Sequence, residues 1–279
     1  MKRLSFFFTL VALFFCSCSR PADELKIISF NIRYNSWNNI DGENGWPHRK
    51  AAVVKMVLEE RPAAIGLQEA LVDQLQYLDS NLPVYRRIGV GRDDGREAGE
   101  FMAIYYDTTR LLLLYDTTRW LSMTPEVPSK YEGAGCYRTV TVARFRDRTS
   151  GHEFAYLNTH LDHVSDDARA RGAQVIGDMV ANSLGGIPVI VGGDMNCTAE
   201  YGEGKPFDFF SRAGLQEARG LTESTSHAIT YNAFGQAEGS VIDHFLVKGM
   251  QVMWFRTLDG DYGVPYISDH YPVEVAINV

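Results

Sequence analysis

The sequence predicts an α/β fold: a four-layer sandwich of two packed, mostly antiparallel sheets flanked by helices. Strand patterns occur in both halves of the chain with helical patterns between them, as two sheets covered by helices require. Residues 85–160 read as nearly continuous strand. The alternative, a (β/α)₈ barrel, needs a helix after every strand and therefore fits this region poorly.

The elements of the first half follow from hydrophobic periodicity and from prolines. Residues 25–32 form a buried strand, and a helix runs from Trp46 to about Glu60, with Pro47 in its first turn and Pro62 beyond its end. We expect the buried face of this helix to carry Ala51, Val54, Val57 and Leu58. A short strand at 63–67 ends at Gln68 and Glu69, and leucines at 71, 75 and 78 indicate a second helix.

The later elements are mainly strands. They are expected at 85–90, 101–106 and 111–121, in a hairpin of 139–145 with 153–159, and at 187–191, 241–247, 251–258 and 272–277. One long helix is predicted at 165–184, ended by two glycines.

The first residues have the pattern of an export signal. A basic start is followed by a short apolar run and then by Cys16-Ser17-Cys18-Ser19. About a dozen apolar residues are too few to span a bilayer. We therefore expect residues 1–17 to be a lipoprotein-type signal with Cys18 as the lipidated mature N-terminus, since small Ser17 precedes it. Cys16 as the lipidated residue and an ordinary cleaved signal are the alternatives.

Length and composition indicate one domain over residues 25–279, because no linker, repeat or low-complexity tract interrupts it. Two cysteines remain beyond the signal, too few to form a disulfide framework. A formal net charge of -8 without lysine or arginine clusters does not suit electrostatic binding of long duplex nucleic acid. A nuclease is still compatible, since bound cations reverse the charge locally.

Six short polar motifs lie where predicted strands end. They read SFNIR at 29–33, GLQEA at 66–70, LNTHLDH at 157–163, VGGDMN at 191–196, VIDHF at 241–245 and ISDHYPV at 267–273. If the fold brings them together, they form a cluster of carboxylates, amides and imidazoles. Such a cluster suits hard divalent cations and the hydrolysis of a phosphate ester.

Each motif also has a plainer explanation. Glu69 after an apolar run could bind a metal or could be a charge at a helix N-terminus. Asp194 and Asn196, two residues apart, could orient water and bind phosphate, or could form an Asx turn. His160 and His270 could polarise a phosphate, with Asp243 orienting one of them, or could be structural.

Taken in order, the motifs resemble the endonuclease/exonuclease/phosphatase superfamily, which includes deoxyribonucleases, apurinic endonucleases, neutral sphingomyelinases, inositol polyphosphate 5-phosphatases and poly(A) deadenylases. The resemblance covers residues 25–279. The stretches DGENGWPHRK, IGVGRDDG, RWLSMTP and YRTVTVARF resemble its secreted bacterial branch.

The resemblance implies a role for each motif residue. It implies a metal site of Asn31, Glu69 and Asp269, a water-orienting Asp194, phosphate contacts from His160, Asn196 and His270, and an Asp243 that pairs with His270. Apurinic endonucleases carry an Asp where this chain has Arg33, so that ligand is absent here. Arg33, Arg138 and Arg169 are further candidates for substrate binding, and Tyr34, Trp37 and Trp46 for a substrate platform or for packing.

The sequence thus predicts an exported, lipid-anchored hydrolase of the bacterial cell envelope that depends on Mg²⁺ or Mn²⁺ and cleaves a phosphate ester. A phosphodiesterase or nuclease is the first interpretation. A phospholipid or sugar-phosphate phosphoesterase, sphingomyelinase-like or inositol-phosphatase-like, is the alternative, and an inactive binding protein on the same scaffold is a third. The expected partners are the phosphate-ester substrate and a membrane reached through the N-terminal lipid alone. No protein partner is implied.

Overall fold

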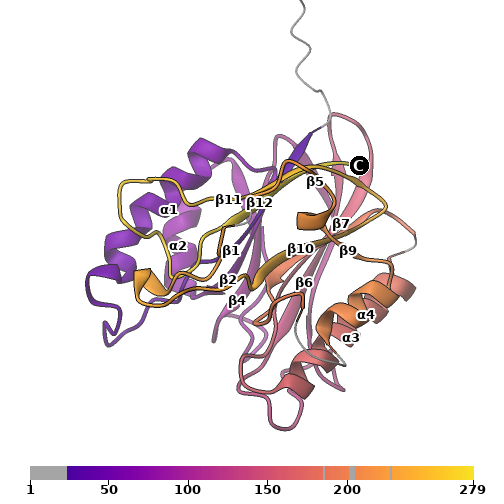
Figure 1. Cartoon of the computed structure of the whole chain (residues 1–279), viewed down its shortest axis with the longest axis horizontal. Coiled ribbons are helices and arrows are strands. Elements are labelled where there is room, and N and C mark those ends of the chain that lie inside the picture. The colour runs from indigo at the N-terminus through magenta and orange to yellow at the C-terminus, as the bar shows by residue number, and fades with distance from the viewer. Residues whose placement is uncertain (1–23, 185, 201–204, 227) are drawn as a thin grey trace, which may run out of the picture.

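A computed structural model describes residues 24–184, 186–200, 205–226 and 228–279 of the chain. They form two six-stranded sheets packed face to face with helices outside them (Figure 1). The predicted export signal and Cys18 lie outside the described residues. The predicted sandwich is confirmed, and each sheet contains one parallel pair of strands among antiparallel ones.

The first sheet combines the N-terminal and C-terminal parts of the chain. Its order is β11-β12-β1-β2-β4-β3, and only β1 and β2 run parallel. The strands are β1 (Leu25–Asn31), β2 (Ala64–Ala70), β3 (Tyr85–Ile88), β4 (Phe101–Asp107), β11 (Gln251–Thr257) and β12 (Val273–Asn278).

The second sheet is built from the middle of the chain. Its order is β5-β6-β7-β8-β10-β9, and only β7 and β8 run parallel. The strands are β5 (Leu111–Trp120), β6 (Thr139–Asp147), β7 (Glu153–His160), β8 (Val189–Asp194), β9 (Gln216–Glu217) and β10 (Asp243–Lys248).

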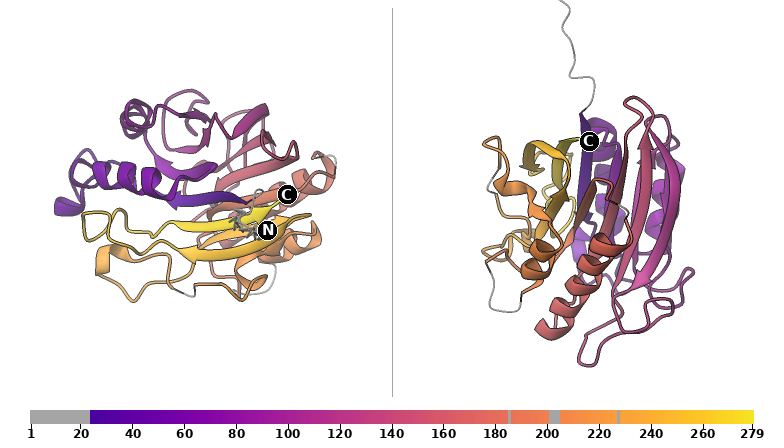
Figure 2. Two further views of the ribbon diagram at one scale, coloured as in Figure 1. Left: turned by 90° about the horizontal axis from the view of Figure 1, so that it is seen from above. Right: turned by 90° about the vertical axis from the view of Figure 1, so that its right-hand side faces the viewer.

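Helices cover the outer face of each sheet. α1 (Trp46–Glu60) and α2 (Val72–Asn81) pack on the first sheet, and α3 (Asp166–Asn182) and α4 (Pro206–Arg212) on the second. In the right-hand view of Figure 2, α3 and α4 lie nearest the viewer and α1 and α2 lie behind the strands. Short 3₁₀ turns occur at Gly42–Asn44, Ala218–Gly220 and Ala233–Gly235. Three apolar clusters result, one under each pair of helices and one between the sheets.

The two sheets approach closely through buried polar contacts. Tyr156 of β7 donates its hydroxyl to Ile28 O at 3.1 Å, and Asn158 donates to Leu67 O and Ala103 O, both at 2.9 Å. A Cβ on Gly66 would lie 2.3 Å from the Tyr156 hydroxyl, so only glycine fits there. These contacts fix how the two sheets are aligned. They therefore also fix the relative positions of the strand ends that carry the motifs.

Some local expectations were wrong. The buried residues of α1 include Ala52, Val53 and Met56, whereas Ala51 and Leu58 are exposed. β9 and α4 were not anticipated, because two and seven residues are too short to show a period. Within the described ranges, no helix has the length and apolar character needed to cross a bilayer.

Candidate active site

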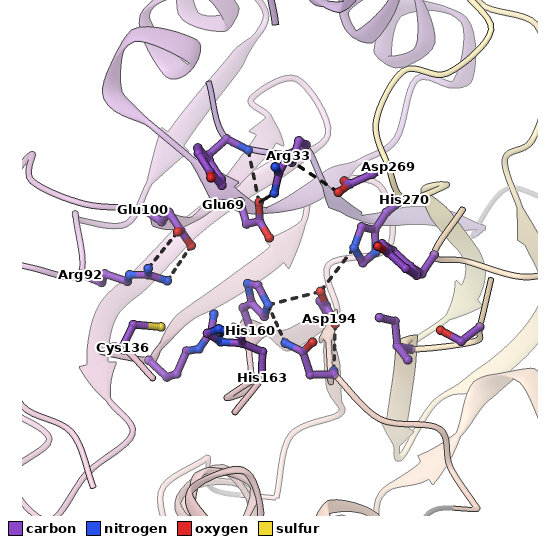
Figure 3. A pocket seen from close by; sticks show the side chains of 16 residues that line it. Arg33, Glu69, Arg92, Glu100, Cys136, His160, His163, Asp194, Asp269 and His270 are labelled. Carbon is purple, nitrogen blue, oxygen red and sulfur yellow. Dashed lines mark hydrogen bonds and ion pairs between the residues drawn. The ribbon is translucent and has the colours of Figure 1, made fainter. Parts of the chain in front are cut away.

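The topology brings the six motifs to one end of the sandwich. Parallel strands end at the same sheet edge, so Asn31 of β1 lies beside Gln68 of β2, and His160 of β7 beside Asp194 of β8. β10 runs antiparallel to β8, which pairs its first residue, Asp243, with Asp194. The strand ends surround a cleft of about 600 Å³ (Figure 3).

Glu69 reaches this cleft through an irregular backbone. The register between β2 and β4 shifts between Leu67 and Ala70, and Glu69 has φ of 61°. A positive φ is unusual for a residue with a side chain and is found where function or packing requires it. The bulge turns the Glu69 carboxylate into the cleft. The predicted short strand therefore continues past Glu69 to Ala70.

Asn31 connects the carboxylates of the two sheets. Its Nδ2 donates to Glu69 Oε1 and to Asp194 Oδ2, each at 3.0 Å, and lies 3.4 Å from His270 Nε2. Its Oδ1 accepts the Arg33 N–H at 3.0 Å. A fully buried amide with all of these partners fixes the spacing between the site residues.

Asp194, Asp243 and His270 form a buried charged network. His270 Nδ1 donates to Asp243 Oδ2 at 2.8 Å, and its Nε2 lies 3.7 Å from Asp194 Oδ2. Burial alone would lower the pKa of His270, but Asp243 and then Asp194 raise it to about 10. Burial, followed by the charge of Asp243, raises the pKa of Asp194 to about 6. At neutral pH this part of the site therefore holds a cationic imidazole between two carboxylates.

His160 and Asn196 complete the floor of the cleft. Asn196 Nδ2 lies 2.8 Å from His160 Nε2 and donates to Leu161 O at 3.0 Å. Burial, and next the charge of Arg138, lowers the pKa of His160 well below its usual value, so this imidazole is neutral. The Asn196 N–H donates to Asp194 Oδ1 at 2.8 Å, so the Asx turn exists and its side chains also line the cleft.

Glu69 and Asp269 are the carboxylates that fit a divalent cation. They lie on either side of the Arg33 guanidinium, which is 4.0 Å from Glu69 Oε2 and 3.8 Å from Asp269 Oδ2. Burial, together with the Glu69 charge, raises the pKa of Asp269, although His270 opposes this. A hard cation held by these oxygens would offset the negative charge of the two carboxylates. Asn31 is bonded to one of them, Glu69.

Asp194, Asp243 and His270 also place ligand atoms within 4.8 Å of one another. One hydrogen bond and one ion pair of His270 account for that grouping, because both of its ring nitrogens face carboxylates. Glu69 and Asp269 are therefore the carboxylates left to hold a cation.

The arginines predicted to bind substrate take different places. Arg33 lines the cleft, but two of its nitrogens donate to the Asp41 carboxylate at 3.0 and 3.1 Å. Arg138 also lines the cleft. Arg169 is not among the lining residues; it is buried and donates to Asp162 O and to the Asp166 carboxylate.

The aromatic candidates separate in the same way. Tyr34 lines the cleft, and Trp37 is 95% exposed. Trp46 is buried with its ring edge-on to Tyr77, so its role is packing.

Several lining residues were not anticipated. They are Arg92, Glu100, Cys136, His163, Tyr231, Ser240 and Ile242. Glu100 had a usable signal, a carboxylate directly before an apolar strand, comparable to Glu69, which directly follows one. The others lie in loops, which have no hydrophobic period to show which side chains face a cleft.

A sandwich with carboxylates, an imidazole pair and an Asp-x-Asn turn at one end defines a class of hydrolases that cleave phosphate esters. The sequence matches the Endonuclease/Exonuclease/phosphatase family over residues 28–270, and the chain belongs to this family.

Solved structures agree with this assignment. A family protein of Bacteroides vulgatus is 29% identical, with a TM-score of 0.85, and the match covers 92% of this chain and 99% of that one. A mannosyl-6-phosphatase of Bacteroides thetaiotaomicron is 30% identical, with a TM-score of 0.84 over 91% of this chain and all of that one. By sequence, the chain also resembles Nocturnin of Drosophila melanogaster, with 28% identity over 202 aligned positions; the match covers 65% of this chain but only 30% of that protein.

Proposed function

We propose that this protein hydrolyses small phosphate esters with water as the nucleophile and that sugar phosphates are its first substrate class. The observation that carries the proposal is the position of Asp194, a carboxylate at the floor of the cleft between His160, Asn196 and His270.

Each residue at the floor of the cleft has its own role in the proposed reaction. Asp194, ionised at neutral pH, accepts a proton from the attacking water. The water oxygen then bonds to phosphorus as the bond from phosphorus to the leaving oxygen breaks. The cationic His270 and the amide of Asn196 bind the non-bridging oxygens, on which negative charge develops. A divalent cation held by Glu69 and Asp269 would neutralise charge on the phosphate.

The cleft and the overall charge favour a small substrate. About 600 Å³ is the size of a small-molecule site, and a net charge of -8 opposes binding along a nucleic-acid backbone. The related mannosyl-6-phosphatase supports a sugar phosphate. For this reason we rank the sugar-phosphate alternative above the nuclease that the sequence placed first.

A nucleotide phosphodiesterase is the second candidate. Tyr34 and Tyr231 line the cleft, and the Tyr231 ring lies 5.0 Å from that of His270. Aromatic rings at such a site can stack on a base.

A substrate screen tests the proposal. Purified protein with Mg²⁺ or Mn²⁺ should release phosphate from hexose 6-phosphates faster than it cleaves DNA, RNA, cyclic nucleotides, sphingomyelin or inositol phosphates. Excess chelator should abolish the activity, and Asp194→Asn should lower it by about 10²- to 10⁴-fold. Turnover that neither change reduces would refute the mechanism, and a preference for a nucleotide would select the second candidate.

We also propose that the protein is exported and anchored through a lipid on Cys18. The short apolar run and Ser17 before this cysteine support it. Lipid labelling and membrane association in the native host should be lost in Cys18→Ala. Labelling that persists would implicate Cys16, and an unlabelled natural protein would indicate an ordinary signal.

A further inference from the structure

The cleft has a second, basic side that the proposed reaction does not use. Arg92, Cys136 and His163 line it together with Arg138. Figure 3 shows Arg92 and Cys136 on the side of His160 away from His270 and Asp269. The floor of the cleft, formed by His160 and Asn196, therefore lies between a side rich in carboxylates and a side that presents guanidinium groups.

Arg138 is buried there with donors to spare. Only 6% of the residue is exposed, yet its Nε and Nη1 have no hydrogen-bond partner among the described residues. Its Nη2 lies 2.8 Å from His163 Nδ1. A buried guanidinium with unused donors is costly unless a ligand completes them.

The nearby acids do not satisfy Arg138. Asp162 Oδ2 is 3.7 Å from Arg138 Nε, beyond hydrogen-bond distance, and its carboxylate already accepts the N–H groups of Gly135, Val164 and Ser165. Glu100 is bound at both oxygens by Arg92, at 2.6 and 2.8 Å. The basic side thus keeps two unfilled guanidinium donors, because Asp162 offers Arg138 an ion pair but no hydrogen bond.

The other cations at the cleft, unlike Arg138, have a carboxylate within hydrogen-bond distance: His270 has Asp243, and Arg33 has Asp41. Among the described lining residues, His270 faces Asp243 and Asp194, and Arg33 faces Asp41, Glu69 and Asp269. Arg138 and Arg92 are also near enough to His160 for their charges to lower its pKa. A second negative charge on a substrate at the floor would therefore be drawn toward Arg138.

We propose that Arg138, supported by Arg92 and His163, forms an anion subsite that selects substrates carrying a second negative charge on the scissile phosphate or beside it. This charge belongs either to a terminal, dianionic phosphoryl group or to an anionic group on the leaving portion. The inference rests on the proposed function and narrows its substrate class.

Kinetics of Arg138→Gln test the subsite. Three substrates are compared with Mg²⁺: p-nitrophenyl phosphate, bis(p-nitrophenyl) phosphate, which lacks the second charge, and a hexose bisphosphate. We expect kcat/KM for p-nitrophenyl phosphate to fall about 10- to 100-fold, the loss of hydrogen bonds to a charged group, with the diester changed less than threefold. A loss confined to the bisphosphate would assign the charge to the leaving portion. Equal losses on all three, or no loss on any, would overturn the proposal.

Two further variants guard against misfolding. Arg138→Lys keeps the charge with fewer donors and should recover part of the lost selectivity for p-nitrophenyl phosphate. Arg146→Gln removes an arginine that binds Glu153 on the exposed part of β6 and should match the natural protein on every substrate. Thermal unfolding of each variant should show a folded protein.

Binding of inorganic phosphate separates this inference from the proposed function. With chelator present, calorimetry at a pH where phosphate is a dianion should show at least tenfold weaker binding to Arg138→Gln than to the natural protein. If no ester is hydrolysed but this difference is seen, the proposed reaction fails and the subsite stands. Equal binding by the two proteins would remove the subsite whatever the activity.

Discussion

At the scale of residues, the site is a chain of buried contacts around Asp194. Asn31, His160, Asn196 and His270 all lie within hydrogen-bond or ion-pair distance of it. Each contact has a consequence for charge. The same Asp243 that keeps His270 cationic also makes Asp194 harder to ionise. The two groups should therefore set opposite limbs of a pH profile.

We expect kcat to fall on both sides of neutrality. Asp194 must be ionised to accept a proton, so activity is lost as the pH falls through its pKa of about 6, or lower when a cation beside it favours the ionised form. His270 must be protonated, so activity is lost as the pH rises through its pKa of about 10. Asp243→Asn removes the charge that raises this pKa and should move the alkaline limb to lower pH. An unmoved alkaline limb in that variant would mean that His270 does not set it.

Sequence reasoning found the residues beside predicted strands and missed those in loops. Glu69, Asp194 and His270 follow or precede apolar runs, where a charged or polar group needs a reason. Arg92 and His163 lie in polar segments that look the same whether they face solvent or a cleft. Arg169 shows the converse error, because a position near His160 along the chain does not decide where a long side chain points.

At the scale of elements, α1 shows why a helix could be placed correctly and its buried face misjudged. The expected bounds agree with Trp46–Glu60, since Pro47 and Pro62 mark the ends. The buried stripe, however, contains Arg49, which a hydrophobic pattern assigns to solvent. Its guanidinium donates to Ile32 O at 2.8 Å, to Ile267 O at 2.7 Å and to Asn44 O at 2.5 Å. The buried face of the helix therefore differs from the expected one, because it includes Arg49. This side chain binds the segment that follows Asn31 and the segment that precedes Asp269.

We predict that Arg49→Met destabilises the fold and loosens the site. Burial lowers the pKa of Arg49 to about 10, so the side chain is still charged at neutral pH. Its loss leaves buried carbonyls unpaired and should lower the free energy of unfolding in urea by about 3 kcal/mol. The concentration of Mg²⁺ needed for activity should also rise, because Asn31 and Asp269 lose their common support.

The control for this variant is Lys55→Met, on the same helix. Lys55 is half-exposed and pairs with Glu59 at 3.8 Å, so its removal should cost less than about 1 kcal/mol. Equal effects of the two substitutions would show that Arg49 has no special role.

At the scale of the whole molecule, the site exists only because two sheets pack in one alignment. Asn31 and Glu69 come from the first sheet, and His160, Asp194 and Asp243 from the second. The contact between Asn31 and Asp194 joins residues 163 positions apart. The pattern of the sequence predicts two sheets and their edges, but the alignment depends on buried contacts such as Tyr156 with Ile28, which no local period reveals.

The most direct test of the proposed mechanism separates metal binding from water activation. Mg²⁺ is titrated against the activity of Glu69→Gln, of Asp194→Asn and of a control, Glu59→Gln, on the exposed part of α1. Glu69→Gln should raise the Mg²⁺ concentration for half-maximal activity at least tenfold and recover turnover at saturation. Asp194→Asn should lower kcat by about 10²- to 10⁴-fold with that concentration unchanged, as expected for loss of a general base. The same phenotype in both variants, or activity without a divalent cation, would contradict the account.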